Sequence, residues 1–71
     1  MSKATRNKLG KNIRNLRREK DWSQEELADK VGLHRTYVGA IERGEQNVTI
    51  DTLAKIAKAL SASFTQLFKD M

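Results

Sequence analysis

The sequence contains no cysteine, no proline and only one histidine, His34. Without cysteine there is no disulfide, no thiolate nucleophile and no cysteine-ligated zinc site. His34 alone cannot build a metal site, so we expect no metal and no cofactor. An enzyme is also disfavoured, because an active site needs convergent ligands or a paired base and nucleophile. The absence of proline and of strand-type alternation favours long helices.

Long apolar runs are also missing. No run approaches the roughly 20 residues that span a bilayer, and the basic first residues are not followed by the apolar stretch of a secretory signal. We therefore expect no membrane partner and a cytoplasmic location. The 71 residues have room for one domain, residues 1–71, with residues 1–4 as a flexible terminus. This excludes a separate ligand-sensing module, so no small-molecule effector is expected. So small a core benefits from a partner subunit.

Positive charge is concentrated at the start of the chain. The 14 Lys and Arg residues exceed the 9 Asp and Glu residues, which gives a formal charge of +5. Residues 1–20 contain eight bases and a single acid, Glu19. A solvated helix face with a loose terminus and a surface that binds a polyanion explain this run about equally well.

Hydrophobic periodicity and capping signals predict five helices joined by short turns, and therefore a compact all-α domain. The predicted helices are Thr5–Glu19, Gln24–Val31, Arg35–Arg43, Ile50–Leu60, and a short last helix capped by Ser63 and running through Lys69. The apolar stripe of the first is Leu9, Ile13 and Leu16. That of the fourth is Ile50, Leu53, Ile56, Ala57 and Leu60. Gly10 should weaken the first helix slightly.

The second and third helices form the most informative segment, QEELADKVGLHRTYVGAIERG. A turn at Gly32 joins them into a right-angle unit. When Leu33, Val38 and Ile41 face inward, the outer face of the third helix carries Thr36, Gly39, Ala40 and Arg43. Gly39 and Ala40 remove bulk where the helix would lie close to another surface. Arg35, Thr36 and Tyr37 gather at the N-terminal end, the end that reaches base edges in a DNA major groove.

Several spaced motifs carry a family resemblance. They are S-Q-E-E-L-A, V-G-L, I-E-R-G and the apolar helix T-I-D-T-L-A-K-I-A-K-A-L. From about Leu9 to Phe68 the chain resembles the Cro/repressor-type (XRE) family of helix-turn-helix DNA-binding regulators. Within it, R-T-Y-V-G-A-I-E-R-G-E-Q-N-V-T-I is most similar to controller proteins of restriction–modification systems. The resemblance implies a lambda-repressor-like fold and a homodimer that binds a pseudopalindromic operator in double-stranded DNA.

The resemblance also implies roles for residues. The expected base-reading residues are Arg35, Thr36 and Tyr37, although Tyr37 could instead be a half-buried core aromatic. The expected contacts to the DNA backbone are Gln24, Arg43, Gln46, Asn47 and Thr49, of which Thr49 could instead cap the fourth helix. Arg17 and Glu42 are expected to form a structural, partly exposed ion pair of modest stability. His34 is expected to cap the third helix or touch a phosphate.

The last helix is the expected dimer interface. Its residues are Phe64, Leu67 and Phe68, with Ile50 or Leu53 nearby and Met71 as a further candidate. The alternative is that Phe64 and Leu67 belong to the core and Phe68 covers its edge. A second class of function also remains open, an antitoxin of the same fold that binds a protein toxin.

Overall fold

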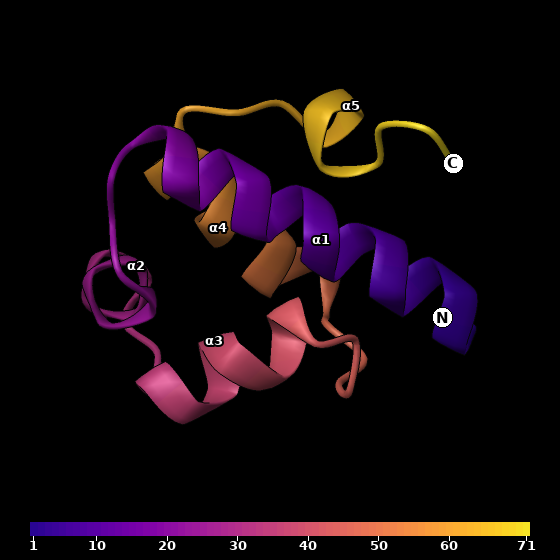
Figure 1. Cartoon of the computed structure of the whole chain (residues 1–71), viewed down its shortest axis with the longest axis horizontal. Coiled ribbons are helices and arrows are strands. Elements are labelled where there is room, and N and C mark those ends of the chain that lie inside the picture. The colour runs from indigo at the N-terminus through magenta and orange to yellow at the C-terminus, as the bar shows by residue number, and fades with distance from the viewer.

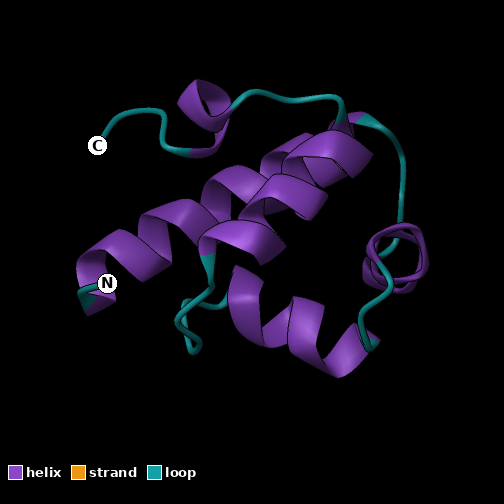
Figure 2. Cartoon of the chain, turned by 180° about the vertical axis from the view of Figure 1, so that it is seen from behind, coloured by secondary structure: helices purple, strands orange, loops and turns teal.

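Five helices follow one another in the computed structural model, which describes all 71 residues. They are α1 (Lys3–Glu19), α2 (Gln24–Val31), α3 (Arg35–Glu42), α4 (Ile50–Leu60) and α5 (Phe64–Leu67). Figure 1 shows α1 across the middle of the molecule, with α3 below it, α5 above it and α4 behind it. Short loops make all the connections and no strand is present (Figure 2). The predicted all-α, five-helix fold is confirmed.

Local capping sets most helix ends. The Ser23 and Glu26 capping box opens α2, and Gly32 closes it with a φ of 81°. The helix α1 begins at Lys3 rather than Thr5, because the Ser2 hydroxyl accepts from the Thr5 amide at 3.1 Å. Residues 3 and 4, which were assigned to a flexible terminus, form the start of this helix.

The helices α3 and α5 end earlier than the sequence predicts. Arg43 is the C-cap of α3 and not its last residue. The helix α5 ends at Leu67, before the expected Lys69, with Phe68 as its C-cap.

The core is one apolar cluster to which every helix contributes side chains. Its members are Leu9, Ile13, Leu27, Ala28, Val38, Ile41, Val48, Leu53, Ile56, Ala57, Leu60 and Leu67. Two positions differ from the sequence prediction. Ile50, the first residue of α4, is 65% exposed and does not belong to the core. Val48, assigned to a polar loop, is buried and joins the core from the segment that leads into α4.

The backbones of α1 and α3 lie close together at Gly10. A Cβ atom at this position would run into the backbone carbonyl oxygens of Ile41 and Glu42. The residue that the sequence marked as a slight weakness thus lets the C-terminal end of α3 lie on the backbone of α1. The following loop is tied to the same helix, since Arg6 Nε donates to the Gly44 carbonyl at 2.9 Å.

None of the helices is both long enough and apolar enough to cross a membrane.

Candidate nucleic-acid interface

The turn between α2 and α3 fixes the angle between these two helices. The amides of Gly32 and Leu33 both donate to the Ala28 carbonyl, at 2.8 and 2.9 Å. His34 Nδ1 then accepts from the Thr36 amide at 3.1 Å and caps α3. In Figure 1, α2 is seen end-on while α3 runs across the page, so the two helices cross steeply.

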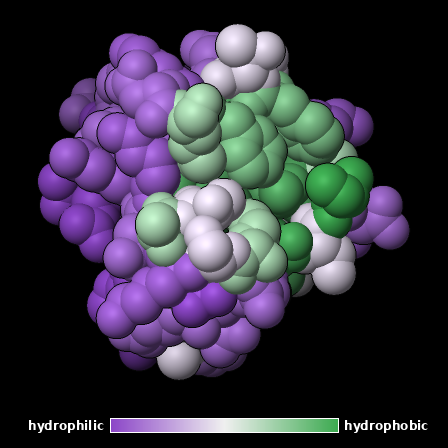
Figure 3. All heavy atoms as spheres, turned by 90° about the vertical axis from the view of Figure 1, so that its right-hand side faces the viewer, coloured by the Kyte–Doolittle hydropathy of each residue, from purple (hydrophilic) through white to green (hydrophobic).

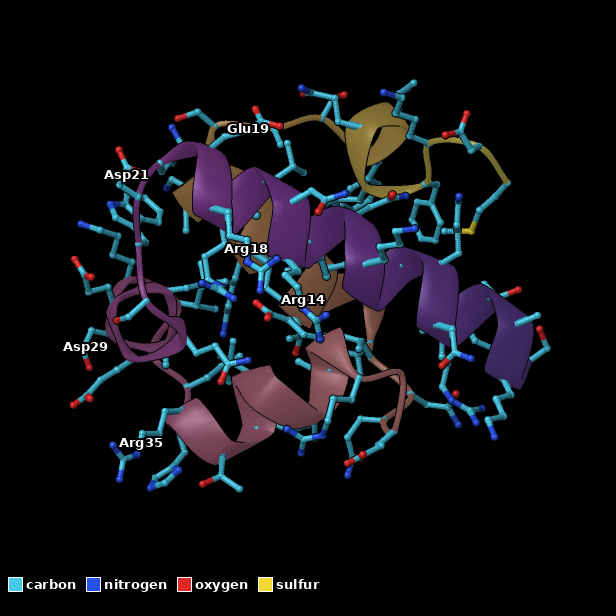
Figure 4. All side chains as sticks on the ribbon, viewed as in Figure 1. Arg14, Arg18, Glu19, Asp21, Asp29 and Arg35 are labelled. Carbon is cyan, nitrogen blue, oxygen red and sulfur yellow. The ribbon has the colours of Figure 1, made fainter.

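The N-terminal end of α3 faces solvent. The side chain of Arg35 is 67% exposed and points away from the body of the protein (Figure 4). Its Nη1 lies 3.4 Å from the exposed carboxylate of Glu25, a contact that water screens strongly. Thr36 is exposed as well, and Tyr37 is half-buried against the core. The structure therefore presents Arg35 and Thr36 on a free helix end, with Tyr37 at its edge.

The middle of α3 is covered, contrary to the sequence prediction. Gly39 and Ala40 were expected on an open outer face, and both are buried. A Cβ on Gly39 would lie 3.1 Å from Arg43 Nη1 and 3.3 Å from Gln24 Oε1. The side chains of Gln24 and Arg43 thus both lie over Gly39. This brings together two of the expected DNA-backbone residues, from different helices.

A buried carboxylate joins α1, α2 and α3. Arg17 Nε and Nη2 donate to the two carboxylate oxygens of Glu42 at 2.7 and 3.0 Å, and Arg17 Nη1 donates to the Trp22 carbonyl at 2.7 Å. Gln24 Nε2 donates to Glu42 Oε1 at 3.0 Å. The Glu42 side chain has no exposed surface and that of Arg17 only 9%. The pair was expected to be partly exposed. It is buried instead, where α1, α2 and α3 meet.

Glu42 stays ionised in this setting. Burial alone would raise its pKa, but the hydrogen bonds from Arg17 and Gln24 and the charges of Arg17 and Arg14 outweigh burial, and the pKa of Glu42 lies below its usual value of 4.5. The hydrogen bond to Glu42 likewise raises the pKa of Arg17. The Gln24 side chain, expected to bind phosphate, is held in place by this carboxylate.

The loop after α3 holds the other expected backbone-contact residues. Arg43 Nε and Nη2 donate to the Glu45 carboxylate at 2.9 and 3.2 Å, with both side chains exposed. Gln46 and Asn47 are exposed without side-chain hydrogen bonds to the protein. Thr49 caps α4, since its hydroxyl accepts from the Thr52 amide at 3.1 Å. The alternative reading of Thr49 as a cap is therefore realised in the structure.

The expected dimer residues separate into core and surface. Leu67 has 0% exposure, so it cannot contribute surface to an interface and that prediction is wrong. It is buried because α5 packs on α1, where Asn12 Nδ2 donates to the Leu67 and Lys69 carbonyls at 2.9 and 3.0 Å. Phe64 is 40% exposed and Phe68 is half-buried. Apolar side chains gather on the face at the right of Figure 1, as Figure 3 shows.

The sequence analysis did not identify Arg14 as a residue of this site. Its Nε lies 3.5 Å from Glu42 Oε1, so two arginines of α1 share one carboxylate. Helical spacing carried a signal, because Arg14 stands three residues before Arg17 and residues at that spacing are neighbours on a helix surface.

Comparison with known proteins agrees with this geometry. The sequence model of the helix-turn-helix family HTH_3 matches residues 13–67. The chain belongs to the HTH_3 family. This HTH_3 chain is a DNA-binding transcription regulator and not an enzyme. The predicted resemblance is confirmed.

Individual HTH_3 relatives are restriction–modification controllers. The chain is 51% identical to control protein C.SmaI of Serratia marcescens over 59 residues, which cover 83% of this chain and 70% of that protein. The crystal structure of controller protein C.AhdI from Aeromonas hydrophila superposes with a TM-score of 0.88 at 45% identity, and covers 92% of this chain and 98% of that chain. Controller protein C.Esp1396I, solved as a tetramer with its natural 35 base-pair operator, gives a TM-score of 0.79 at 41% identity over 89% of this chain and 83% of that chain.

Proposed function

We propose that this regulator binds a pseudopalindromic operator as a homodimer and controls the genes of a restriction–modification system from the cytoplasm. The observation that carries the proposal is the free N-terminal end of α3, where Arg35 and Thr36 are exposed while Val38 and Ile41 lock the opposite side into the core. The similarity to three controller proteins, one of them solved on its operator, supports the choice of system.

Base reading is assigned to Arg35, Thr36 and Tyr37. The guanidinium of Arg35 matches the O6 and N7 acceptors of guanine, and the methyl group of Thr36 suits a thymine methyl. Breaking the exposed contact between Arg35 and Glu25 costs little, because such pairs are weak in water. Tyr37 lies at the edge of the same helix end, where it can contact the sugar-phosphate backbone or a flexible base step.

Phosphate contacts are assigned to residues beside the reading helix and in the loop that follows it. Gln24 lies at the start of α2, and Arg43 lies at the end of α3. The exposed loop residues Gln46 and Asn47 follow, and the Thr49 hydroxyl is shared with its capping role. Contacts of this kind set the register of the helix in the groove and make affinity depend on salt.

Replacing Arg35 with alanine tests base reading. We expect binding to an operator selected from random duplexes to weaken by roughly 1–3 kcal/mol per half-site, while binding to random DNA changes far less. Fluorescence anisotropy on the two DNAs measures both affinities at one salt concentration. The variant Lys55→Ala on α4, which also removes one exposed positive charge, serves as the matched control. An equal loss on both DNAs for Arg35→Ala would show that Arg35 does not read bases.

The homodimer is assigned to the apolar surface at the starts of α4 and α5. Ile50 and Phe64 are exposed there, and α4 and α5 contact each other. Two reading helices can occupy half-sites about 34 Å apart only when a two-fold interface holds them.

Replacing Ile50 with glutamate is expected to convert the dimer to a monomer. A carboxylate in the interface would be desolvated without a partner, whereas in the monomer it is tolerated at the first residue of α4, where the helix dipole favours an acid. Sedimentation velocity measures the oligomeric state. Lys55→Glu, on another side of α4, introduces the same carboxylate and should leave the dimer intact. If Ile50→Glu sediments like the wild type, the interface lies elsewhere.

A further inference from the structure

The guanidinium of Arg14 has two nitrogen atoms, Nη1 and Nη2, that donate no hydrogen bond within the protein. Its Nε lies 3.5 Å from Glu42 Oε1, and neither Nη1 nor Nη2 makes a hydrogen bond to the protein. Arg17, three residues later, is the opposite case, since it donates from Nε, Nη1 and Nη2 and is buried. The side chain of Arg14 is 35% exposed, so part of it remains in contact with solvent.

The charges around Glu42 do not cancel. One carboxylate faces two guanidiniums, those of Arg14 and Arg17. Arg18 adds a further positive charge, is exposed and takes part in no ion pair. In Figure 4, Arg14 and Arg18 lie between α1 and α3, whereas Glu19 and Asp21 lie at the upper edge of the molecule, away from α3. The charged groups Arg14, Arg17, Arg18 and Glu42 together are therefore net positive.

Arg14 is also adjacent to the expected phosphate contact of α2. The Arg14 Nε and the Gln24 Nε2 both approach the same oxygen, Glu42 Oε1, at 3.5 and 3.0 Å. The side chains of Gln24 and Arg43 both lie over Gly39. A phosphate that approaches Gln24 would thus come within reach of the open edge of Arg14.

We propose that Arg14 is a further DNA-backbone contact, which binds a phosphate oxygen through its free Nη1 and Nη2 edge while Glu42 holds its Nε from behind. The fork of two N–H groups matches a phosphate better than a lysine ammonium does. This inference rests on the proposed function, and it assigns the buried carboxylate a second role, the orientation of one arginine toward DNA while it fixes another inside the fold.

The test is the salt dependence of DNA binding by the full-length Arg14→Gln variant. Each lost phosphate contact lowers the slope of log affinity against log salt by about 0.9, so a dimer with two copies of Arg14 should lose about 1.8. The probe is a random-sequence DNA duplex, measured by fluorescence anisotropy over a series of KCl concentrations. In this variant Arg17 still neutralises Glu42 and Gln24 still donates a hydrogen bond to it, so the fold should persist. Arg14→Lys should keep most of the slope while binding more weakly at each salt concentration.

A control variant distinguishes the loss of a direct phosphate contact from the loss of one positive charge elsewhere on the protein. Lys58→Gln, on the exposed surface of α4, removes the same charge and should leave the slope nearly unchanged. A lower melting temperature for Arg14→Gln with an unaltered slope would make Arg14 a purely structural partner of Glu42 and overturn the inference. Wild-type protein without salt-dependent DNA binding would instead refute the proposed function itself.

Discussion

Replacing Glu42 with alanine is expected to destabilise the folded protein by about 3–5 kcal/mol. The change removes the carboxylate and leaves the guanidinium of Arg17 between helices with only the Trp22 carbonyl, a nearly uncompensated buried charge. Native proteins are stable by only about 5–15 kcal/mol, so this loss is a large share of the free energy of unfolding. Urea unfolding followed by circular dichroism measures the loss.

The double variant Arg17→Met with Glu42→Leu provides the control. It removes both charges and fills similar volume, so most of the lost stability should return, as occurs when buried ion pairs are replaced by apolar side chains. A loss of less than about 1 kcal/mol for Glu42→Ala would mean that the pair behaves in solution like a screened surface contact.

The stability that the Arg17–Glu42 pair contributes should be lost at acidic pH. The pKa of Glu42 in the folded protein lies below its usual value of 4.5, so the unfolded chain takes up the proton first. The contribution of Glu42 is therefore fully present above about pH 4.5 and is lost as the pH falls through the lower, folded-state pKa. The double variant should lose less stability than the wild type between about pH 5 and pH 3.

Replacing Gly10 with alanine is expected to destabilise the fold, against helix propensity. In an exposed helix interior this change gains up to about 1 kcal/mol. Here the new Cβ would overlap the carbonyl oxygens of Ile41 and Glu42, which belong to backbone and cannot rotate away. Overpacking of this kind costs about 1–3 kcal/mol, and the separation of α3 from α1 would also disturb the Glu42 network. Thermal and urea unfolding measure the change.

Gly39→Ala is the matched control. It is the same substitution in another buried helical position, but its Cβ would meet the flexible ends of Arg43 and Gln24 at 3.1 and 3.3 Å. Those side chains can move, so the change in stability should stay within about 1 kcal/mol of zero. Equal stability changes for the two variants would contradict the close approach of α1 and α3.

Some residues of the candidate site could be predicted from local sequence signals, and others depend on contacts between distant segments. Arg35 and Thr36 could be placed on a free helix end, because the apolar positions of α3 leave them outside and His34 caps the helix locally. The cover over Gly39 could not be foreseen, since Gln24 and Arg43 come from different helices. Leu67 was assigned to an interface because periodicity marks a residue as apolar without showing whether it meets the protein's own core or another subunit.

The sequence by itself determined the five helices, most of their ends and the helix-turn-helix unit, since capping boxes, positive-φ glycines and a 3.6-residue period act within a few residues of each other. Tertiary structure alone decided the burial of the Arg17–Glu42 pair, the need for glycine at position 10 and the open edge of Arg14. Each involves a contact between α1 and the end of α3, and no short-range signal encodes contacts between residues as far apart in the chain as Arg17 and Glu42, which are 25 positions apart.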